Sequence, residues 1–306
     1  MRAVSFLPFL GLAACAPEAA PDAWAASSCD SSAPYLGRAR SSSRRDLRLV
    51  LRDGAELALS TRAPDGIACV GAVVEVPPGF DTGTPYLDRD QAQLLARAGL
   101  LVVTFDPRGR GESGGVDDEN GPTGQDDFAE VLRWTSAQSG VDADSIVIWS
   151  RSFGGALAGG AIGTFEDLQP RAWIDYESPA MLAIDLPYAD AFTSERMFAL
   201  AEASGDAEAW LLERSPAAHI SSMTAPYHRL QGASDHALDT LDAAAEMLNA
   251  AASSEHRLLN GKVVTTPLTE DDIHDHAYGG RFDPDGDIAT RAVIEASGFS
   301  PGASVR

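Results

Sequence analysis

The serine best suited to chemistry is Ser152, which lies in the stretch 145–160. The apolar run 146–149 predicts a buried strand, and the small residues after Gly155 predict a helix. A serine in a tight turn between a strand and a helix is typical of a nucleophile elbow, whose strained backbone lifts the hydroxyl off the sheet. Ser150 stands where glycine is usual, so a glycine-rich turn without chemistry is the alternative interpretation.

A serine hydroxyl attacks a carbonyl carbon only when a base takes its proton, and the base needs a carboxylate to fix its tautomer. In an elbow enzyme the residues follow in the order serine, acid, histidine. Asp235 comes just after a predicted strand and is a candidate acid, and His236 is set aside because it adjoins that acid. Of the six histidines, His274 and His276 lie on a loop after the last predicted strand, and both are candidate bases.

Strand-like and helix-like segments alternate along most of the chain and must position these residues. A hairpin signal at Asp53 and Gly54 opens the series. Predicted strands cover 47–52, 56–60, 71–76, 100–105, 146–149, 171–176, 227–232 and 258–266, and predicted helices cover 88–98, 125–138, 238–251 and 287–297 in addition to the elbow helix. Such alternation predicts an α/β protein with a mostly parallel, doubly wound sheet and helices on both faces.

Three motifs that precede the elbow are similar to the α/β-hydrolase family. The run 76–80 (VPPGF) lies where that family has its oxyanion loop, and 106–113 (DPRGRGES) resembles its D-x-R-G-x-G-x-S turn. The stretch 125–134, within the predicted helix over 125–138, resembles the peptidase and esterase branch of the family. The resemblance covers about 47–299 and implies the α/β-hydrolase fold.

The resemblance also ranks the candidate acids and bases. Asp235 lies in a loop close to the family's G-x-x-D, so it is the predicted acid. Glu177 and Asp175 are the alternatives, because some relatives place the acid after the preceding strand. His276 is followed after one residue by an aromatic residue, as is common in the family, so it is the predicted base and His274 is the alternative.

Acyl transfer also needs hydrogen-bond donors for the oxyanion that develops on the substrate. The backbone N–H of Phe153, directly after the nucleophile, is one predicted donor. The resemblance implies a second donor on the oxyanion loop. Phe80 is the choice, because Pro78 stands where many relatives have histidine and proline has no N–H.

The segment 177–225 interrupts the alternation of strands and helices. Short helices are predicted at 197–203 and 207–212. In the family such an insertion forms a small helical cap, which excludes water and shapes the substrate pocket. The resemblance therefore implies a cap over the site.

The N-terminus is typical of an export signal. Arg2 is followed by an apolar run and by Leu-Ala-Ala-Cys at 12–15, which resembles a bacterial lipobox. We expect a signal peptide at 1–14, lipidation of Cys15, and an Ala/Pro/Ser-rich tether over 15–45 before the hydrolase domain at 46–306. These features predict an exported cell-envelope lipoprotein anchored in the lipid bilayer.

Charge and cysteine content restrict the partners and cofactors. The formal net charge of −22 argues against nucleic acid as a partner. Cys29 and Cys69 are the cysteines left after the lipobox, and in an exported chain they could form one disulfide. We predict no cofactor and no metal, although the acidic and histidine-rich run 271–276 offers a rival metal site.

The leading hypothesis is a serine hydrolase that cleaves a carboxylic ester through an acyl-enzyme intermediate. A peptidase of the prolyl-oligopeptidase type would use the same residues, so a small ester and a short peptide are both candidate substrates. Two rivals stay open. One is a noncatalytic, surface-anchored binding protein with the same fold. The other is a metal-dependent hydrolase built on His274 and His276.

Overall fold

The computed structural model describes residues 18–19, 29, 39–67 and 69–298. The predicted signal peptide and Cys15 lie outside these residues. None of the helices in the described part of the chain has both the length and the apolar character needed to cross a membrane.

A central sheet organises the described residues, with the strand order β1-β2-β3-β5-β4-β6-β7-β8-β9-β10. Neighbouring strands from β5 to β9 in this order are parallel, whereas β2, β3 and β10 pair antiparallel at the two sides. The strands are β1 (Glu18–Ala19), β2 (Ser42–Val50), β3 (Glu56–Pro64), β4 (Val70–Val76), β5 (Leu100–Phe105), β6 (Val141–Arg151), β7 (Ala172–Tyr176), β8 (Tyr227–Leu230), β9 (Arg257–Leu259) and β10 (Lys262–Val263).

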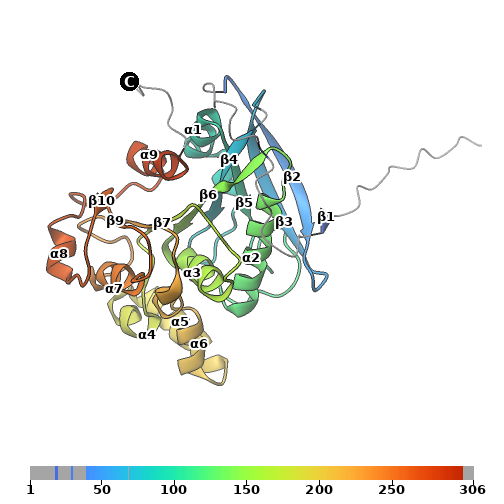
Figure 1. The fold of residues 1–306 in the computed structure, drawn as a ribbon. Coiled ribbons are helices and arrows are strands. Elements are labelled where there is room, and N and C mark those ends of the chain that lie inside the picture. Colours follow the sequence, from blue (N-terminus) through green and yellow to red (C-terminus); the bar gives the residue numbers. More distant parts are fainter. Residues whose placement is uncertain (1–17, 20–28, 30–38, 68, 299–306) are drawn as a thin grey trace, which may run out of the picture.

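Helices cover both faces of this sheet (Figure 1). Helices α1 and α9 pack on one face, and α2, α3 and α7 pack on the other. The helices are α1 (Asp90–Ala98), α2 (Pro122–Ser136), α3 (Gly155–Thr164), α4 (Leu182–Asp185), α5 (Ala191–Ala203), α6 (Ala207–Glu213), α7 (Asp242–Ala250), α8 (Glu270–His274) and α9 (Asp287–Ala296). The predicted α/β-hydrolase fold, with a mostly parallel sheet between two helix layers, is confirmed.

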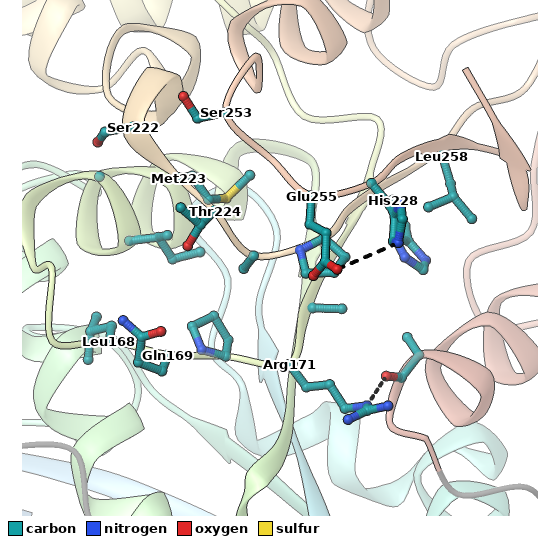
Figure 2. A pocket seen from close by; sticks show the side chains of 18 of the residues that line it. Leu168, Gln169, Arg171, Ser222, Met223, Thr224, His228, Ser253, Glu255 and Leu258 are labelled. Carbon is teal, nitrogen blue, oxygen red and sulfur yellow. Dashed lines mark hydrogen bonds and ion pairs between the residues drawn. The ribbon is translucent and has the colours of Figure 1, made fainter. Parts of the chain in front are cut away.

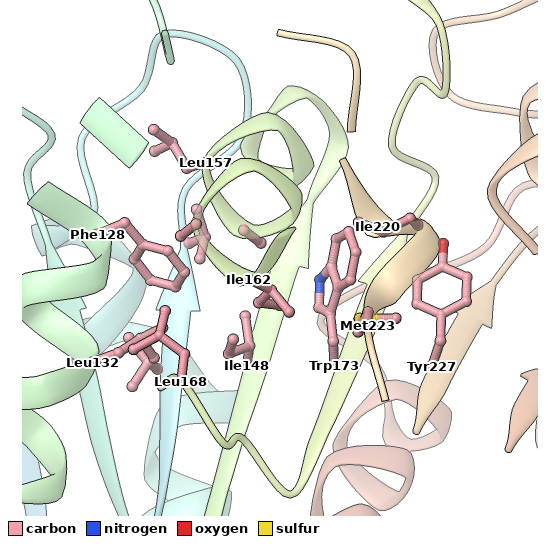
Figure 3. Packing of buried hydrophobic residues seen from close by; sticks show 14 of the residues in the cluster. Phe128, Leu132, Ile148, Leu157, Ile162, Leu168, Trp173, Ile220, Met223 and Tyr227 are labelled. Carbon is pink, nitrogen blue, oxygen red and sulfur yellow. The ribbon is translucent and has the colours of Figure 1, made fainter. Parts of the chain in front are cut away.

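Burial on both faces explains why the central strands are continuously apolar. Every residue of β4 and of β5 is buried. On one face Phe128 of α2 and Leu157 and Ile162 of α3 pack over Ile148 of β6 (Figure 3). The packed layer holds the end of β6, and therefore the elbow, in one position.

The N-terminal boundary of the folded part differs from the prediction. Strand β2 begins at Ser42, so residues 42–45 belong to the sheet and not to the predicted tether. Cys29 and Cys69 form the expected disulfide, with a Cα–Cα distance of 5.5 Å. The bond fixes a residue of the predicted tether to the segment that enters β4.

The insertion between β7 and β8 is helical, as expected for a cap. It contains α4, α5 and α6. Met197, Trp210 and Leu211 of this insertion form an apolar cluster with Phe153 and Ala156 of the elbow. The cap is therefore packed directly on the turn that carries Ser152.

Candidate active site

The elbow has the strained geometry that its sequence predicts. Strand β6 ends at Arg151, Ser152 has a φ of 51°, and α3 begins at Gly155. A positive φ is costly for a residue with a side chain, and such strain is typical of nucleophiles held at the apex of a turn. A Cβ atom at Gly154 would collide with the backbone oxygen of Pro77. Close approach of two backbones thus requires glycine after the nucleophile.

Ser150 occupies the position on the near side of the elbow where glycine is usual. It is fully buried, accepts a hydrogen bond from Nε1 of Trp173 at 2.8 Å, and donates one to Oδ1 of Asp175 at 3.1 Å. The other carboxylate oxygen of Asp175 pairs with buried Arg229 at 2.7 Å. Asp175 is therefore part of the support beneath the elbow, and the structure does not bring it to Ser152 as the acid.

Ser152 faces His236. Nε2 of His236 lies 2.8 Å from Oγ of Ser152, and Nδ1 of the same ring lies 2.8 Å from Oε2 of Glu177. The His236 ring stacks on Tyr176, with the ring centres 5.1 Å apart. A hydroxyl, an imidazole and a carboxylate in a hydrogen-bonded row form the geometry of a catalytic triad. The chain order of the three residues is serine, acid, histidine, as expected for an elbow enzyme.

The predicted pairing of Ser152 with His276 is wrong. Nδ1 of His276 lies 2.9 Å from the carbonyl oxygen of Asp272, and the side chain of Asn260 donates to the carbonyl of His276 at 2.9 Å. The alternative His274 ends α8 and lines a separate cavity, which does not include Ser152. Helix α8 packs against α7, whereas the loop after β8 carries His236 to Ser152.

The predicted acid, Asp235, lies near His236 but is not its closest carboxylate. Its Oδ1 lies 3.4 Å from Nδ1 of His236, whereas Glu177 lies at 2.8 Å. The same Oδ1 accepts two backbone amides of its own loop at 2.9 and 3.1 Å, and Oδ2 accepts from Nε2 of Gln231 at 3.0 Å. Asp235 closes the turn that presents His236, and the alternative acid, Glu177, takes the triad position.

Glu177 is held as a charged acceptor. Its side chain is buried and accepts from the backbone N–H of Gly232 at 2.8 Å and from that of His236 at 3.0 Å. Burial opposes the charged form, but the hydrogen bonds from His236 and Gly232 outweigh it and hold the pKa of Glu177 below its ordinary value. A carboxylate is therefore in place behind the imidazole at neutral pH.

The two predicted oxyanion donors lie on the same cavity as Ser152. Phe153 follows the nucleophile, and Phe80 lies on the loop after β4, with the two ring centres 5.7 Å apart. Within the described ranges, neither backbone N–H donates a hydrogen bond to the protein. Free amides beside a nucleophile are the donors that an oxyanion needs.

The cavity around Ser152 has a volume of about 330 Å³ and mostly apolar walls. The cap contributes apolar residues to it, namely Leu182, Leu186, Phe192 and Met197. Arg196 of α5 lies at the edge, with its guanidinium carbon 3.9 Å from the centre of the Phe80 ring. The cap therefore forms an apolar wall of the cavity at Ser152.

A larger cavity, of about 1170 Å³, lies at the opposite edge of the sheet, where β7, β8 and β9 begin (Figure 2). Arg171, Met223, Glu255 and Leu258 are among its lining residues. Among the described residues around it, Ser254 donates to the backbone carbonyl of His256 at 2.8 Å, and no serine hydroxyl contacts a histidine ring. Because parallel sheets bind ligands at the carboxyl ends of their strands, the smaller cavity at Ser152 is the candidate active site.

Glu177, Asp235 and His236 also place one ligand atom each within 4.8 Å of one another, which is compatible with a metal site. However, Nε2 of His236 faces Ser152, and the contacted Glu177 and Asp235 oxygens accept protein hydrogen bonds. The ligands of a metal ion must point at one centre, whereas these side-chain atoms point at protein partners. The arrangement therefore suits a triad better than a metal ion. The rival metal site at 271–276 gains no support, because His276 contacts a backbone carbonyl.

The fold and the elbow define a hydrolase of the α/β-hydrolase superfamily. More narrowly, the chain belongs to the prolyl oligopeptidase family, whose model matches residues 85–252. The matched part contains the elbow, the cap and the loop of His236. No curated protein matches the chain.

Solved structures share the fold at low sequence identity. An acetyl xylan esterase from Paenibacillus sp. R4 is 16% identical, with a TM-score of 0.59 and 84% of both chains covered. An esterase from Pyrococcus furiosus is 12% identical, with a TM-score of 0.57, 84% of this chain covered and 91% of that one. A prolyl endopeptidase is 15% identical, with a TM-score of 0.62; the match covers 84% of this chain but 37% of that one.

Proposed function

We propose that the protein hydrolyses a carboxylic ester through an acyl-enzyme intermediate, with Ser152 as nucleophile, His236 as base and Glu177 as the acid that orients it. The observation that carries the proposal is the 2.8 Å contact between Oγ of Ser152 and Nε2 of His236. This distance is within the reach over which a base takes a proton from a nucleophile. The carboxylate of Glu177 on the far nitrogen fixes the tautomer that the base needs.

The reaction has two halves. Oγ of Ser152 bonds to the ester carbonyl carbon while Nε2 of His236 takes the hydroxyl proton, and the N–H groups of Phe80 and Phe153 stabilise the oxyanion. His236 then returns the proton to the alcohol oxygen as the C–O bond breaks. In the second half, water attacks the acyl-serine, His236 takes its proton, and the acid leaves as Oγ is reprotonated.

An ester is favoured over a peptide as the substrate by the cavity. Its volume of about 330 Å³ and apolar walls suit a small acyl group rather than an extended peptide. Two similar folds, from Paenibacillus and Pyrococcus furiosus, are described as esterases. The family match leaves a short peptide as the second candidate, because a peptidase uses the same chemistry. Short-chain nitrophenyl esters compared with dipeptidyl amides would separate the two.

A fluorophosphonate tests the nucleophile, because a reactive serine oxygen bonds to phosphorus and displaces fluoride. We expect labelling of the wild type and of Ser222→Ala, which changes an exposed serine of the other cavity, and none of Ser152→Ala. Labelling that survives Ser152→Ala, or an unlabelled wild type, would overturn the proposal. Loss of ester hydrolysis on adding a chelator would favour the metal-dependent alternative.

We further propose that the protein is exported and anchored in the cell envelope by an acylated Cys15. The support is the short apolar N-terminal segment followed by Leu-Ala-Ala-Cys. In a bacterial host, Cys15→Ser should move the protein from the membrane fraction to the soluble fraction, because the acyl chains are attached to that sulfur. Retention of the Cys15→Ser protein in the membrane fraction would contradict the proposal.

A further inference from the structure

We propose that Asn120 is a positioning residue that fixes the direction of the Phe80 oxyanion donor by tying the Phe80 loop to the elbow. The inference rests on the proposed function, since it concerns the amides of Phe80 and Phe153. Asn120 lies on the loop between β5 and α2 and is 1% exposed. It acts on the reaction through the backbone and is absent from the residues that line the cavity at Ser152.

One side-chain amide joins the two loops that carry the donors. Nδ2 of Asn120 donates to the carbonyl oxygen of Phe153 at 2.9 Å and to that of Gly79 at 3.3 Å. The Gly79 carbonyl and the Phe80 N–H belong to the same peptide unit. In a trans peptide these groups point in opposite directions, so fixing the carbonyl also fixes the direction of the N–H.

The Phe80 peptide needs such a restraint. Gly79 has a φ of 54°, and glycine crosses between backbone conformations at little steric cost. A peptide next to glycine can therefore rotate when its carbonyl loses its donors. Rotation would turn the Phe80 N–H away from the substrate and leave the oxyanion with one amide donor, that of Phe153.

Arg110 orients the amide of Asn120. One guanidinium nitrogen donates to Oδ1 of Asn120 at 2.8 Å, and another donates to the Gly79 carbonyl at 3.2 Å. Two contacts with Asp117, at 2.7 and 2.8 Å, hold the guanidinium in place. Because the arginine offers only donors, Oδ1 must face it and Nδ2 must face the carbonyls.

The backbone at Asn120 is adapted to this task. Its φ is 61°, a region in which asparagine is one of the few residues with a side chain that are enriched. Its carbonyl accepts a hydrogen bond from Nε2 of Gln125 at 3.2 Å. The side chain is thereby aimed from a third loop at the two loops that form the oxyanion site.

The test compares Asn120→Ala and Asn120→Asp with the wild type on a short-chain nitrophenyl ester. Loss of one oxyanion donor costs about 10²- to 10³-fold in kcat, so we expect a fall of at least about 10-fold with KM changed little. Affinity for a trifluoromethyl ketone, which forms an oxyanion on the serine, should fall in parallel with kcat. Asn120→Asp keeps the size of the side chain and the oxygen that accepts from Arg110, but it removes the N–H donor. We expect the same loss of kcat in this variant, which therefore tests the inference even if the alanine variant does not fold.

Asn249→Ala is the matched control. Asn249 also makes two hydrogen bonds to backbone groups, both to Leu268, and lies outside the cavity at Ser152. The Asn249→Ala protein should be less stable than the wild type without a loss of kcat comparable to that of the Asn120 variants. A kcat for Asn120→Asp within about threefold of the wild type, or equal losses of substrate and trifluoromethyl ketone affinity, would overturn the inference. Failure of the wild type to react with the fluorophosphonate would instead contradict the proposed function.

Discussion

Replacing His236 by alanine should lower kcat/KM for a short-chain ester by about 10⁴-fold or more, because the serine loses its base. Nε2 of His236 is the ring nitrogen that the structure places 2.8 Å from Oγ of Ser152. Without it, the hydroxyl proton has no acceptor and the leaving alcohol has no donor. The measurement is the initial rate of nitrophenyl ester hydrolysis, combined with a thermal unfolding curve that confirms folding.

The controls are His276→Ala and His274→Ala, each expected to retain a rate close to that of the wild type. His276 contacts the carbonyl oxygen of Asp272, and His274 lines a separate cavity that does not include Ser152. A large loss in His276→Ala with little change in His236→Ala would reverse the assignment. It would restore the base that the sequence predicts.

Replacing Glu177 by glutamine should lower kcat by about 10²- to 10⁴-fold, because the amide neither fixes the imidazole tautomer nor stabilises the imidazolium. Asp235→Asn should cost much less. Its carboxylate lies 3.4 Å from Nδ1 of His236 and mainly closes a turn, whereas that of Glu177 lies at 2.8 Å. An equal or larger loss in Asp235→Asn would make Asp235 the acid.

The lowered pKa of Glu177 allows a second test, which compares the Tm of the wild type with that of Glu177→Gln at two pH values. A carboxyl whose folded-state pKa is below its unfolded value adds stability at pH values above the unfolded pKa, and the gain disappears as pH falls through the folded pKa. The wild type should therefore exceed Glu177→Gln in Tm at pH 7 by more than it does at a pH below about 4. A Tm difference that is the same at both pH values would contradict a charged Glu177.

Local pattern is sufficient to predict the fold and the elbow that carries Ser152. Each central strand is a continuous apolar run, and the elbow at Ser152 depends on neighbouring residues, so both are visible in a short window of sequence. The hydrogen-bonded residues Ser152, Glu177 and His236 also follow one another along the chain in the expected order of serine, acid and histidine. Phe80 and Phe153 lie together as expected, although their role stays a prediction.

The sequence predicts other partners for Ser152 than the structure shows, because two carboxylates lie close to one imidazole. Glu177 and Asp235 follow the adjacent parallel strands β7 and β8, whose carboxyl ends meet at the same edge of the sheet. Sequence does not show which is closer to the imidazole. The sequence offers no reason to choose His236, which adjoins Asp235, yet the turn that Asp235 closes is what presents the ring to Ser152.

Asn120 could not be found by the same reasoning. Its two carbonyl acceptors belong to residues 79 and 153, which are distant from it along the chain. Its glycine-like φ resembles that of an ordinary turn. A role that depends on joining two other loops leaves no local pattern in the sequence.

The serine before the elbow restricts how this sequence can change. Glycine at position 150 would leave the buried N–H of Trp173 without its acceptor and would remove a donor from Asp175. An unpaired buried polar group costs about 1–3 kcal/mol. Substitutions at Ser150, Trp173 and Asp175 are therefore energetically coupled, so the cost of glycine at position 150 depends on the residues at the other two positions. Serine at this position is thus part of a buried hydrogen-bonded group that supports the elbow, and glycine is not required on this side of the turn.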